Sequence, residues 1–120
     1  MAKIERFEDL ICWQKARELV KKIYRVTLSD KISKDFVLKD QLRRAGISIM
    51  LNISEGFARR TNKDFSKFFY IAHGSAAEVQ SALYVAKDLS YIKESDFEEL
   101  YNDANEISKI ISGLLKKLRE

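Results

Sequence analysis

The sequence predicts an all-α protein that folds as an antiparallel, up-down-up-down four-helix bundle, on three observations. Its 120 residues include no proline and only four glycines, the two residue types that most often interrupt helices. Four long segments carry apolar residues at spacings of three and four, the pattern of an amphipathic helix. Short linkers join these segments, which favours antiparallel packing of consecutive helices. We therefore expect a single domain over residues 1–120.

The first helix is predicted over about residues 9–28 and the second over about 34–59, with residues 29–33 as a linker. The first apolar stripe consists of Cys12, Trp13, Ala16, Leu19, Val20, Ile23 and Thr27. The second consists of Leu38, Leu42, Ala45, Gly46, Ile49, Ile53 and Gly56. Gly46 allows another helix to approach closely, and we expect Trp13 or an aromatic residue of the third helix opposite it.

The third helix is predicted over about residues 62–89 and the fourth over about 96–118. The third stripe consists of Phe65, Phe68, Phe69, Ala72, Ala76, Val79, Leu83 and Ala86. The fourth consists of Phe97, Leu100, Ala104, Ile107, Ile111, Leu114 and Leu118. Ser95 and Glu98 fit a capping box at the start of the fourth helix, and Thr61 with Asp64 forms a weaker one at the third. The small residues Gly74-Ser75-Ala76-Ala77 are expected to allow close helix packing, as Gly46 does.

The second helix has a second apolar side, roughly opposite its core stripe. Because a bundle covers only one side of a helix, this side predicts self-association. A polar edge runs between the two sides and consists of Gln41, Arg44, Ser48, Asn52, Glu55 and Arg59. The expected interface between copies consists of Ile47, Leu51, Asn52, Glu55 and Ala58. The alternatives are a few isolated exposed apolar residues and an ordinary solvated polar edge.

The net charge of +4 is unevenly distributed along the chain. Residues 1–67 carry 16 Lys and Arg against 9 Asp and Glu, whereas residues 68–120 carry 6 against 9. This asymmetry indicates either a surface that binds a polyanion or complementary ion pairs between helices of the same bundle. The candidate nucleic-acid contacts are Arg43, Arg44, Arg59, Arg60 and Lys63, with Lys21, Lys22 and Arg25 on the first helix.

The residues that usually carry chemistry are scarce. One cysteine, Cys12, and one histidine, His73, cannot supply a structural zinc site, and no Glu-x-x-His motif is present for a di-iron centre. The sequence therefore predicts no enzyme activity, no metal and no cofactor. The first residues lack the apolar core of a signal peptide, and no apolar run is long enough to span a bilayer, so we expect a cytoplasmic protein.

A family resemblance emerges from short motifs spread over nearly the whole chain. They include Phe7-Glu8-Asp9-Leu10, Gln41-Leu42-Arg43-Arg44-Ala45, Asn52-Ile53-Ser54-Glu55-Gly56, Phe65-Ser66-Lys67-Phe68 and Ile71-Ala72-His73-Gly74-Ser75. In this order they resemble the bacterial four-helix-bundle family of 23S rRNA intervening-sequence proteins. The chain is also similar to the accessory variability protein of diversity-generating retroelements. The family resemblance implies an up-down four-helix bundle that assembles as a ring-shaped homopentamer. The similarity to the accessory variability protein implies a basic pentamer that binds nucleic acid and a protein partner such as a reverse transcriptase.

The leading hypothesis is a non-enzymatic homo-oligomeric scaffold that binds RNA or DNA through phosphate contacts from a basic surface. The alternative is a protein-interaction adaptor of unknown process that does not bind nucleic acid directly. A third hypothesis places a small-molecule or enzymatic site on the polar edge, around Asn52 and Glu55.

Overall fold

The computed structural model describes residues 4–119, and these contain five α-helices, one short 3₁₀ helix and no strand. The prediction of an all-α chain is confirmed. After the 3₁₀ helix η1 (Phe7–Asp9), the helices are α1 (Ile11–Val26), α2 (Asp30–Lys34), α3 (Phe36–Phe57), α4 (Asn62–Asp88) and α5 (Glu94–Arg119). None of the helices in the described range is long and apolar enough to cross a membrane.

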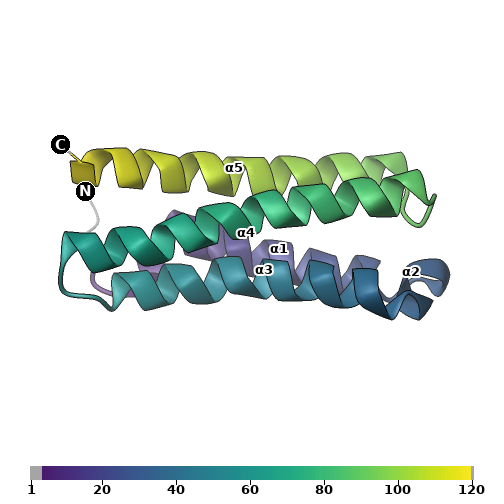
Figure 1. The fold of residues 1–120 in the computed structure, drawn as a ribbon, viewed down its shortest axis with the longest axis horizontal. Helices are drawn as coiled ribbons and strands as arrows, with labels where there is room; N and C mark the ends of the chain where they lie inside the picture. The colour runs from purple at the N-terminus through teal and green to yellow at the C-terminus, as the bar shows by residue number, and fades with distance from the viewer. Residues whose placement is uncertain (1–3, 120) are drawn as a thin grey trace.

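The four long helices lie side by side along the longest dimension of a molecule measuring 44 × 26 × 20 Å (Figure 1). α3 packs most extensively against α4, α4 against α5, and α1 contacts both α3 and α5. α3 joins α4 at the end where α5 terminates, and α4 joins α5 at the end occupied by α2 (Figure 1). The two ends of the molecule therefore carry different connections and different side chains.

The core consists largely of the predicted apolar stripes. All seven predicted core residues of α3 are buried, because their spacing keeps them on one side of the helix. Near the C-terminus of α5, Leu115 is the buried leucine, at 4% exposure, whereas Leu114, which was predicted to be in the core, is only partly buried. Val20, Phe65, Phe68 and Leu118 are likewise only partly buried. These positions lie at the edges of their stripes, where the neighbouring helix decides which residue is covered.

Two predictions about helix ends are wrong. Residues 29–33 are not a plain linker, because Asp30–Lys34 forms the short helix α2, which buries Ile32 completely against the core. Ser95 is not the N-cap of α5, since the amide of Phe97 donates to the carbonyl of Lys93 at 3.0 Å and the helix begins at Glu94. The predicted cap at Thr61 is confirmed, because its hydroxyl accepts from the amide of Asp64 at 3.2 Å.

The glycines differ in what surrounds them. Gly46 faces Ile23 and Val20 of α1 rather than Trp13 or an aromatic ring of α4, and an added Cβ would lie 2.8 Å from Ile23 Cδ1. Gly74 is exposed with no neighbouring atom within 4 Å of an added Cβ, so the expectation of close packing is wrong for Gly74, whereas Ser75 and Ala76 of the same run are buried. Gly56 is the tightest, since an added Cβ would lie 2.7 Å from Cδ1 of Phe69 and 3.1 Å from Cβ of Phe68.

These surroundings predict opposite effects of alanine at two glycines. Gly74→Ala should raise the free energy of unfolding by about 0.5–1 kcal/mol, because alanine favours a helix and meets no neighbour. Gly56→Ala should lower it by about 1–3 kcal/mol, because the buried ring of Phe69 cannot move aside without disturbing the core. Urea denaturation of both variants measures the difference. Equal effects at the two positions would contradict the close packing of Gly56.

Candidate nucleic-acid interface

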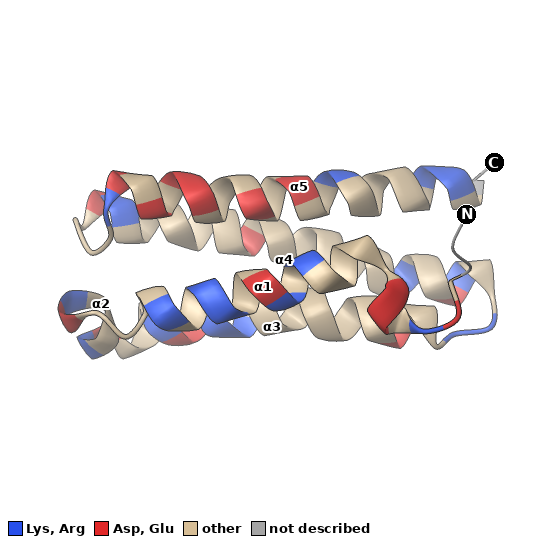
Figure 2. Ribbon diagram, turned by 180° about the vertical axis from the view of Figure 1, so that it is seen from behind, with Lys and Arg blue, Asp and Glu red and all other residues tan. Residues whose placement is uncertain are grey.

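A group of exposed basic residues lies where α3 joins α4. We call Arg59, Arg60, Lys63 and Lys67 the α3–α4 basic cluster; all four are exposed. The capped start of α4 at Thr61 fixes the backbone between the two arginines and the two lysines. Basic residues near the C-terminus of α5 lie at the same end of the molecule (Figure 2). The two adjacent arginines and the two lysines that follow them in the sequence therefore lie around the connection between α3 and α4.

The members of this cluster differ in how far their charge is already compensated. Arg59 forms an ion pair with Glu55, and its guanidinium lies 4.6 Å from the centre of the Phe68 ring. Lys67 lies 5.7 Å from the same ring. Within residues 4–119, neither Arg60 nor Lys63 has an acidic group within ion-pair distance. Arg60 and Lys63 are therefore the best placed to contact an anion from outside.

The structure separates Arg43 and Arg44 from this cluster. Arg44 precedes the end of α3 by 13 residues, or about 20 Å along a helix. Arg43 Nε donates to Thr27 Oγ1 at 2.9 Å, and its guanidinium lies 4.3 Å from the centre of the Tyr24 ring. Since Thr27 is fully buried, Arg43 joins α1 to α3 within the molecule. Arg44 is exposed on α3 and has no such contact among the described residues.

The basic residues of α1 are divided between internal pairs and solvent. Lys22 Nζ lies 2.7 Å from Asp103 Oδ2 and 2.8 Å from Glu99 Oε2, both on α5. Lys15 pairs with Glu106 of α5 at 2.7 Å, and Lys21 pairs with Glu18 of its own helix at 3.5 Å. Figure 2 shows basic residues along α1 and acidic residues along the first half of α5, and the two helices are in contact. Complementary pairing between helices therefore accounts for part of the charge asymmetry.

These contacts shift the pKa values of the groups involved. The hydrogen bonds to Asp103 and Glu99 raise the pKa of Lys22, and the hydrogen bond from Lys22 lowers the pKa of Glu99. Lys22 thus already has two carboxylate partners, which makes it a poor candidate for a phosphate contact. Arg25 is exposed and remains a candidate.

The pairing predicts a defined pH dependence of stability. A carboxylate whose pKa is lowered in the folded state contributes stability above its unfolded pKa, and this contribution is lost as the pH falls. As the pH falls below about 4.5, the ordinary pKa of a glutamate such as Glu99, the free energy of unfolding should therefore decrease less steeply in Lys22→Met than in the wild type. Denaturation curves at several pH values measure this slope, with Lys21→Met as the control. Parallel pH profiles for Lys22→Met and the wild type would contradict the role of the pair.

The second side of α3 is exposed as the sequence predicts. Leu51 is 59% exposed and Ala58 is exposed, whereas Ile47 is half-buried. Asn52 Nδ2 donates to the backbone oxygen of Ser48 at 2.8 Å and lies 3.1 Å from Ser48 Oγ. Ser48 Oγ in turn lies 2.8 Å from Oγ of the buried Ser75 on α4. Asn52 and Glu55 therefore have internal partners, and Leu51 is the apolar residue left open.

Apolar residues that the sequence reasoning missed extend this exposed side. Val37 at the start of α3 is 77% exposed, and Ile71 and Val85 on α4 are 44% and 46% exposed. Val37 and Val85 border one shallow hollow between α3 and α4, together with Gln41 and Glu78. Ile71 and Val85 are 14 residues apart and therefore lie near one side of α4, but the charged Glu78 lies midway between them, so the sequence gives no clear signal of a second apolar face. The exposed apolar surface therefore spans two helices.

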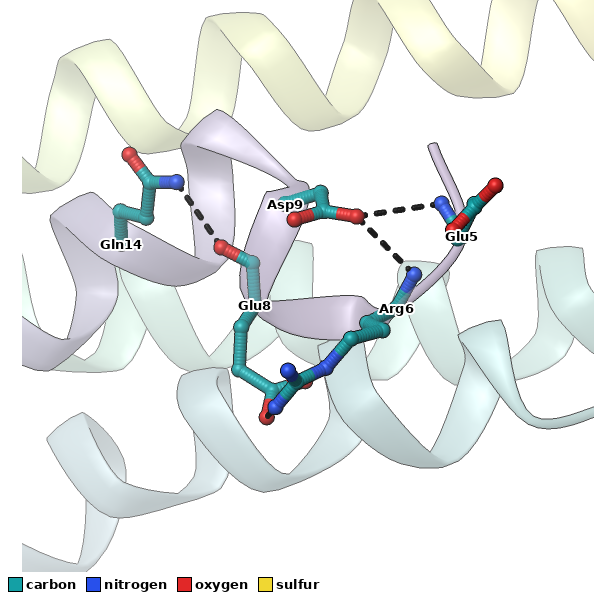
Figure 3. A network of polar contacts seen from close by, with 5 residues as sticks. All are labelled: Glu5, Arg6, Glu8, Asp9 and Gln14. Atoms are coloured by element: carbon teal, nitrogen blue, oxygen red, sulfur yellow. Dashed lines mark hydrogen bonds and ion pairs between the residues drawn. The ribbon is translucent and has the colours of Figure 1, made fainter. Parts of the chain in front are cut away.

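A polar network fastens the N-terminal segment to α1 (Figure 3). The Asp9 carboxylate accepts hydrogen bonds from the amides of Glu5 and Arg6, both at 3.1 Å. Gln14 Nε2 donates to the backbone oxygen of Glu8 at 2.8 Å, and the side chains of Arg6 and Glu8 form an ion pair. The ring of Phe7 packs edge-on against Trp13 with 5.1 Å between centres. These polar groups serve the fold by covering one end of the core.

The single cysteine and histidine lie in different surroundings. Cys12 is fully buried, and the loss of solvent raises the pKa of its thiol to about 11, so it behaves as a small apolar core residue as predicted. His73 borders a hollow of about 120 Å³ with Tyr70, Ser112 and Leu115. No group of three or more His, Cys, Asp or Glu side chains is arranged to hold a metal ion within the described range.

The fold and its surface define an elongated all-α protein with a basic cluster at one end and an exposed apolar side along α3 and α4. The chain belongs to the family of 23S rRNA-intervening sequence proteins, which matches residues 8–113. It is also similar to a crystal structure of a protein of unknown function from the S23 ribosomal protein family of Bacteroides thetaiotaomicron VPI-5482. The two chains are 28% identical with a TM-score of 0.82, over 88% of this chain and 99% of the other. A comparison with curated proteins finds no match.

Proposed function

We propose that this chain is an antiparallel, up-down-up-down four-helix bundle that assembles with copies of itself into a cytoplasmic scaffold for RNA or DNA. In this proposal the scaffold performs no catalysis and holds nucleic acid through its phosphates. The observation that carries it is the exposed pair Arg60 and Lys63, which has no acidic partner among the described residues. The names of the family and of the similar structure, which refer to 23S rRNA and to a ribosomal protein, point to the same class of partner.

Several features of the α3–α4 basic cluster suit phosphate. An arginine guanidinium presents several N–H donors in a plane that matches two phosphate oxygens. α3 ends and α4 begins within the cluster, so their helix dipoles oppose each other there and the positive potential comes from the side chains. The side chains of Arg59 and Lys67 lie over the ring of Phe68. Because this ring already restricts both side chains, they lose less conformational entropy when a phosphate binds. The cluster has no base-reading motif, so we expect binding that depends little on sequence.

The proposed assembly uses the exposed apolar side of α3 and α4. Leu51 lies within this side, and Ile71 and Val85 continue it on α4. The predicted interface residues Ile47, Asn52, Glu55 and Ala58 would form its edge. Five copies, the number that the family resemblance implies, would repeat the basic cluster around a ring and multiply its electrostatic field.

The proposal predicts that Arg60→Glu/Lys63→Glu weakens nucleic-acid binding and lowers its salt dependence. Each lost phosphate contact should reduce the slope of log affinity against log salt by about one unit, so the slope should fall by about two. Fluorescence anisotropy with a labelled RNA duplex, at salt concentrations between about 50 and 200 mM, measures both quantities.

The matched control is Lys93→Glu/Lys109→Glu, which changes the net charge equally at two exposed positions of other segments. This control should retain most of the affinity. If both double variants lose affinity equally, overall charge rather than the α3–α4 basic cluster is responsible. If the wild-type protein binds neither RNA nor DNA at low salt, the proposed function is wrong and the adaptor alternative takes its place.

A further inference from the structure

An exposed aromatic side chain stands beside unpaired lysines at the other end of the molecule. Lys31, Lys34, Asp35, Phe36, Val37 and Tyr91 border an open hollow of about 410 Å³. It is formed by α2, the first residues of α3 and the connection between α4 and α5. None of these residues belongs to the α3–α4 basic cluster.

Phe36 is the feature of this hollow that the fold does not use. Its side chain is 69% exposed, although a phenylalanine normally contributes to stability by being buried. Lys39 Nζ lies 4.6 Å from the centre of its ring, so the ring already carries a cation on one side. An exposed ring of this kind offers a flat surface to another π system.

The backbone that carries Phe36 is held from two directions. Asp35 caps α3, since its Oδ1 accepts from the amide of Leu38 at 3.1 Å. Its Oδ2 accepts from the hydroxyl of Tyr91 at 3.2 Å, which ties the α4–α5 connection to the start of α3. Phe36 follows Asp35 directly, so these hydrogen bonds also hold the backbone from which the ring of Phe36 extends. A preorganised platform of this kind loses little entropy when a ligand binds.

The charges around the hollow favour an anion. Both oxygens of Asp35 already accept hydrogen bonds, from Leu38 and Tyr91. The hollow is bordered by two lysines against one carboxylate, and Asp30 and Asp40 do not line it. Within residues 4–119, neither Lys31 nor Lys34 has an acidic group within ion-pair distance.

We propose that this hollow binds single-stranded nucleic acid, with one base stacked on Phe36 and the adjoining phosphates paired with Lys31 and Lys34. The inference rests on the proposed function and adds a preference for unpaired strands. Bases in a duplex are stacked on one another and cannot reach a side chain of this kind, whereas an unpaired base can. Phosphate contacts at the α3–α4 basic cluster would serve duplex and single strand alike.

The test compares a short single-stranded adenine RNA with an RNA duplex of the same length, by fluorescence anisotropy on the full chain. Phe36→Ala should weaken single-strand binding roughly 5- to 150-fold, the range for loss of one stacked base, and change duplex binding less than about twofold. Phe36→Trp should retain single-strand binding, because tryptophan also stacks. Leu28→Ala, at a 72% exposed leucine before α2, is the control and should change neither affinity.

The outcomes separate this inference from the proposed function. If Phe36→Ala binds single strands within about twofold of the wild type, while Arg60→Glu/Lys63→Glu loses affinity for both RNAs, only the stacking site is wrong. Equal loss of single-strand and duplex binding in Phe36→Ala would also overturn it. A changed oligomer mass of Phe36→Ala in light scattering would show instead that Phe36 contacts another copy. A wild-type protein that binds neither RNA overturns both proposals.

Discussion

Phe69→Ala is expected to lower the free energy of unfolding by about 3–5 kcal/mol, the range for removing a fully buried aromatic side chain. Phe69 is 0% exposed, and its ring stacks on that of Phe65 with 4.1 Å between centres. It also covers Gly56, so it joins the end of α3 to the start of α4 behind the α3–α4 basic cluster. Urea denaturation measures the loss, and the adjacent Tyr70→Ala, 52% exposed in the wild type, should cost less than about 0.5 kcal/mol.

A double variant shows whether the contact between Phe69 and Gly56 is the cause. Gly56→Ala should destabilise the wild type, but it should not destabilise Phe69→Ala further, because the new methyl group would enter the space left by the ring. If Phe69→Ala does not fold, Phe69→Leu replaces it, with an expected cost of about 1–2 kcal/mol. Additive effects of the two substitutions would contradict the packing described here.

Leu51→Lys is expected to break the proposed assembly while leaving each chain folded. Leu51 is 59% exposed in the single chain, so lysine there meets solvent and should not disturb the core. In an assembly the same lysine would place a charge in an apolar contact, which should raise the dissociation constant by roughly 30-fold or more. Sedimentation over a range of concentrations measures the mass, and circular dichroism confirms the helical content.

Leu28→Lys is the matched control for this experiment, because it adds the same charge at a leucine that is 72% exposed at the end of the molecule. It should leave the mass unchanged. A wild-type protein that is monomeric at high micromolar concentration would contradict self-association. A Leu51→Lys variant with the mass of an oligomeric wild type would show that the contact lies elsewhere, and Ile71→Lys on α4 would be the next variant to measure.

Much of the fold and part of the candidate site could be predicted from the sequence. The core residues of α3 were predicted without error because helical spacing alone decides which side chains share a face. Cys12 as a core residue followed from the same periodicity. The basic run from Arg59 to Lys67 was readable because its members are close in sequence and therefore close in space.

Other features depended on contacts between segments that are distant in sequence. The short helix α2 exists because Ile32 packs into the core, and the five residues that form it carry no long apolar pattern. The exposed ring of Phe36 could not be predicted either, since whether an apolar residue at a helix end is covered depends on the neighbouring segments. Gly46 approaches Ile23 rather than an aromatic ring, because the spacing of α1 and α3 decides which residue lies opposite it.

The sequence by itself determined an all-α chain, its four long helices and the residues of each that face inward, because these follow from a periodicity within each segment. Only the tertiary structure decided which cations remain available to a partner. Lys22 pairs with Glu99 and Asp103, and Arg43 contacts Thr27 and Tyr24, whereas Arg60 and Lys63 face solvent. The reason is physical: a charged residue is compensated by whichever helix packs beside it, and that neighbour is set by the fold of the whole chain.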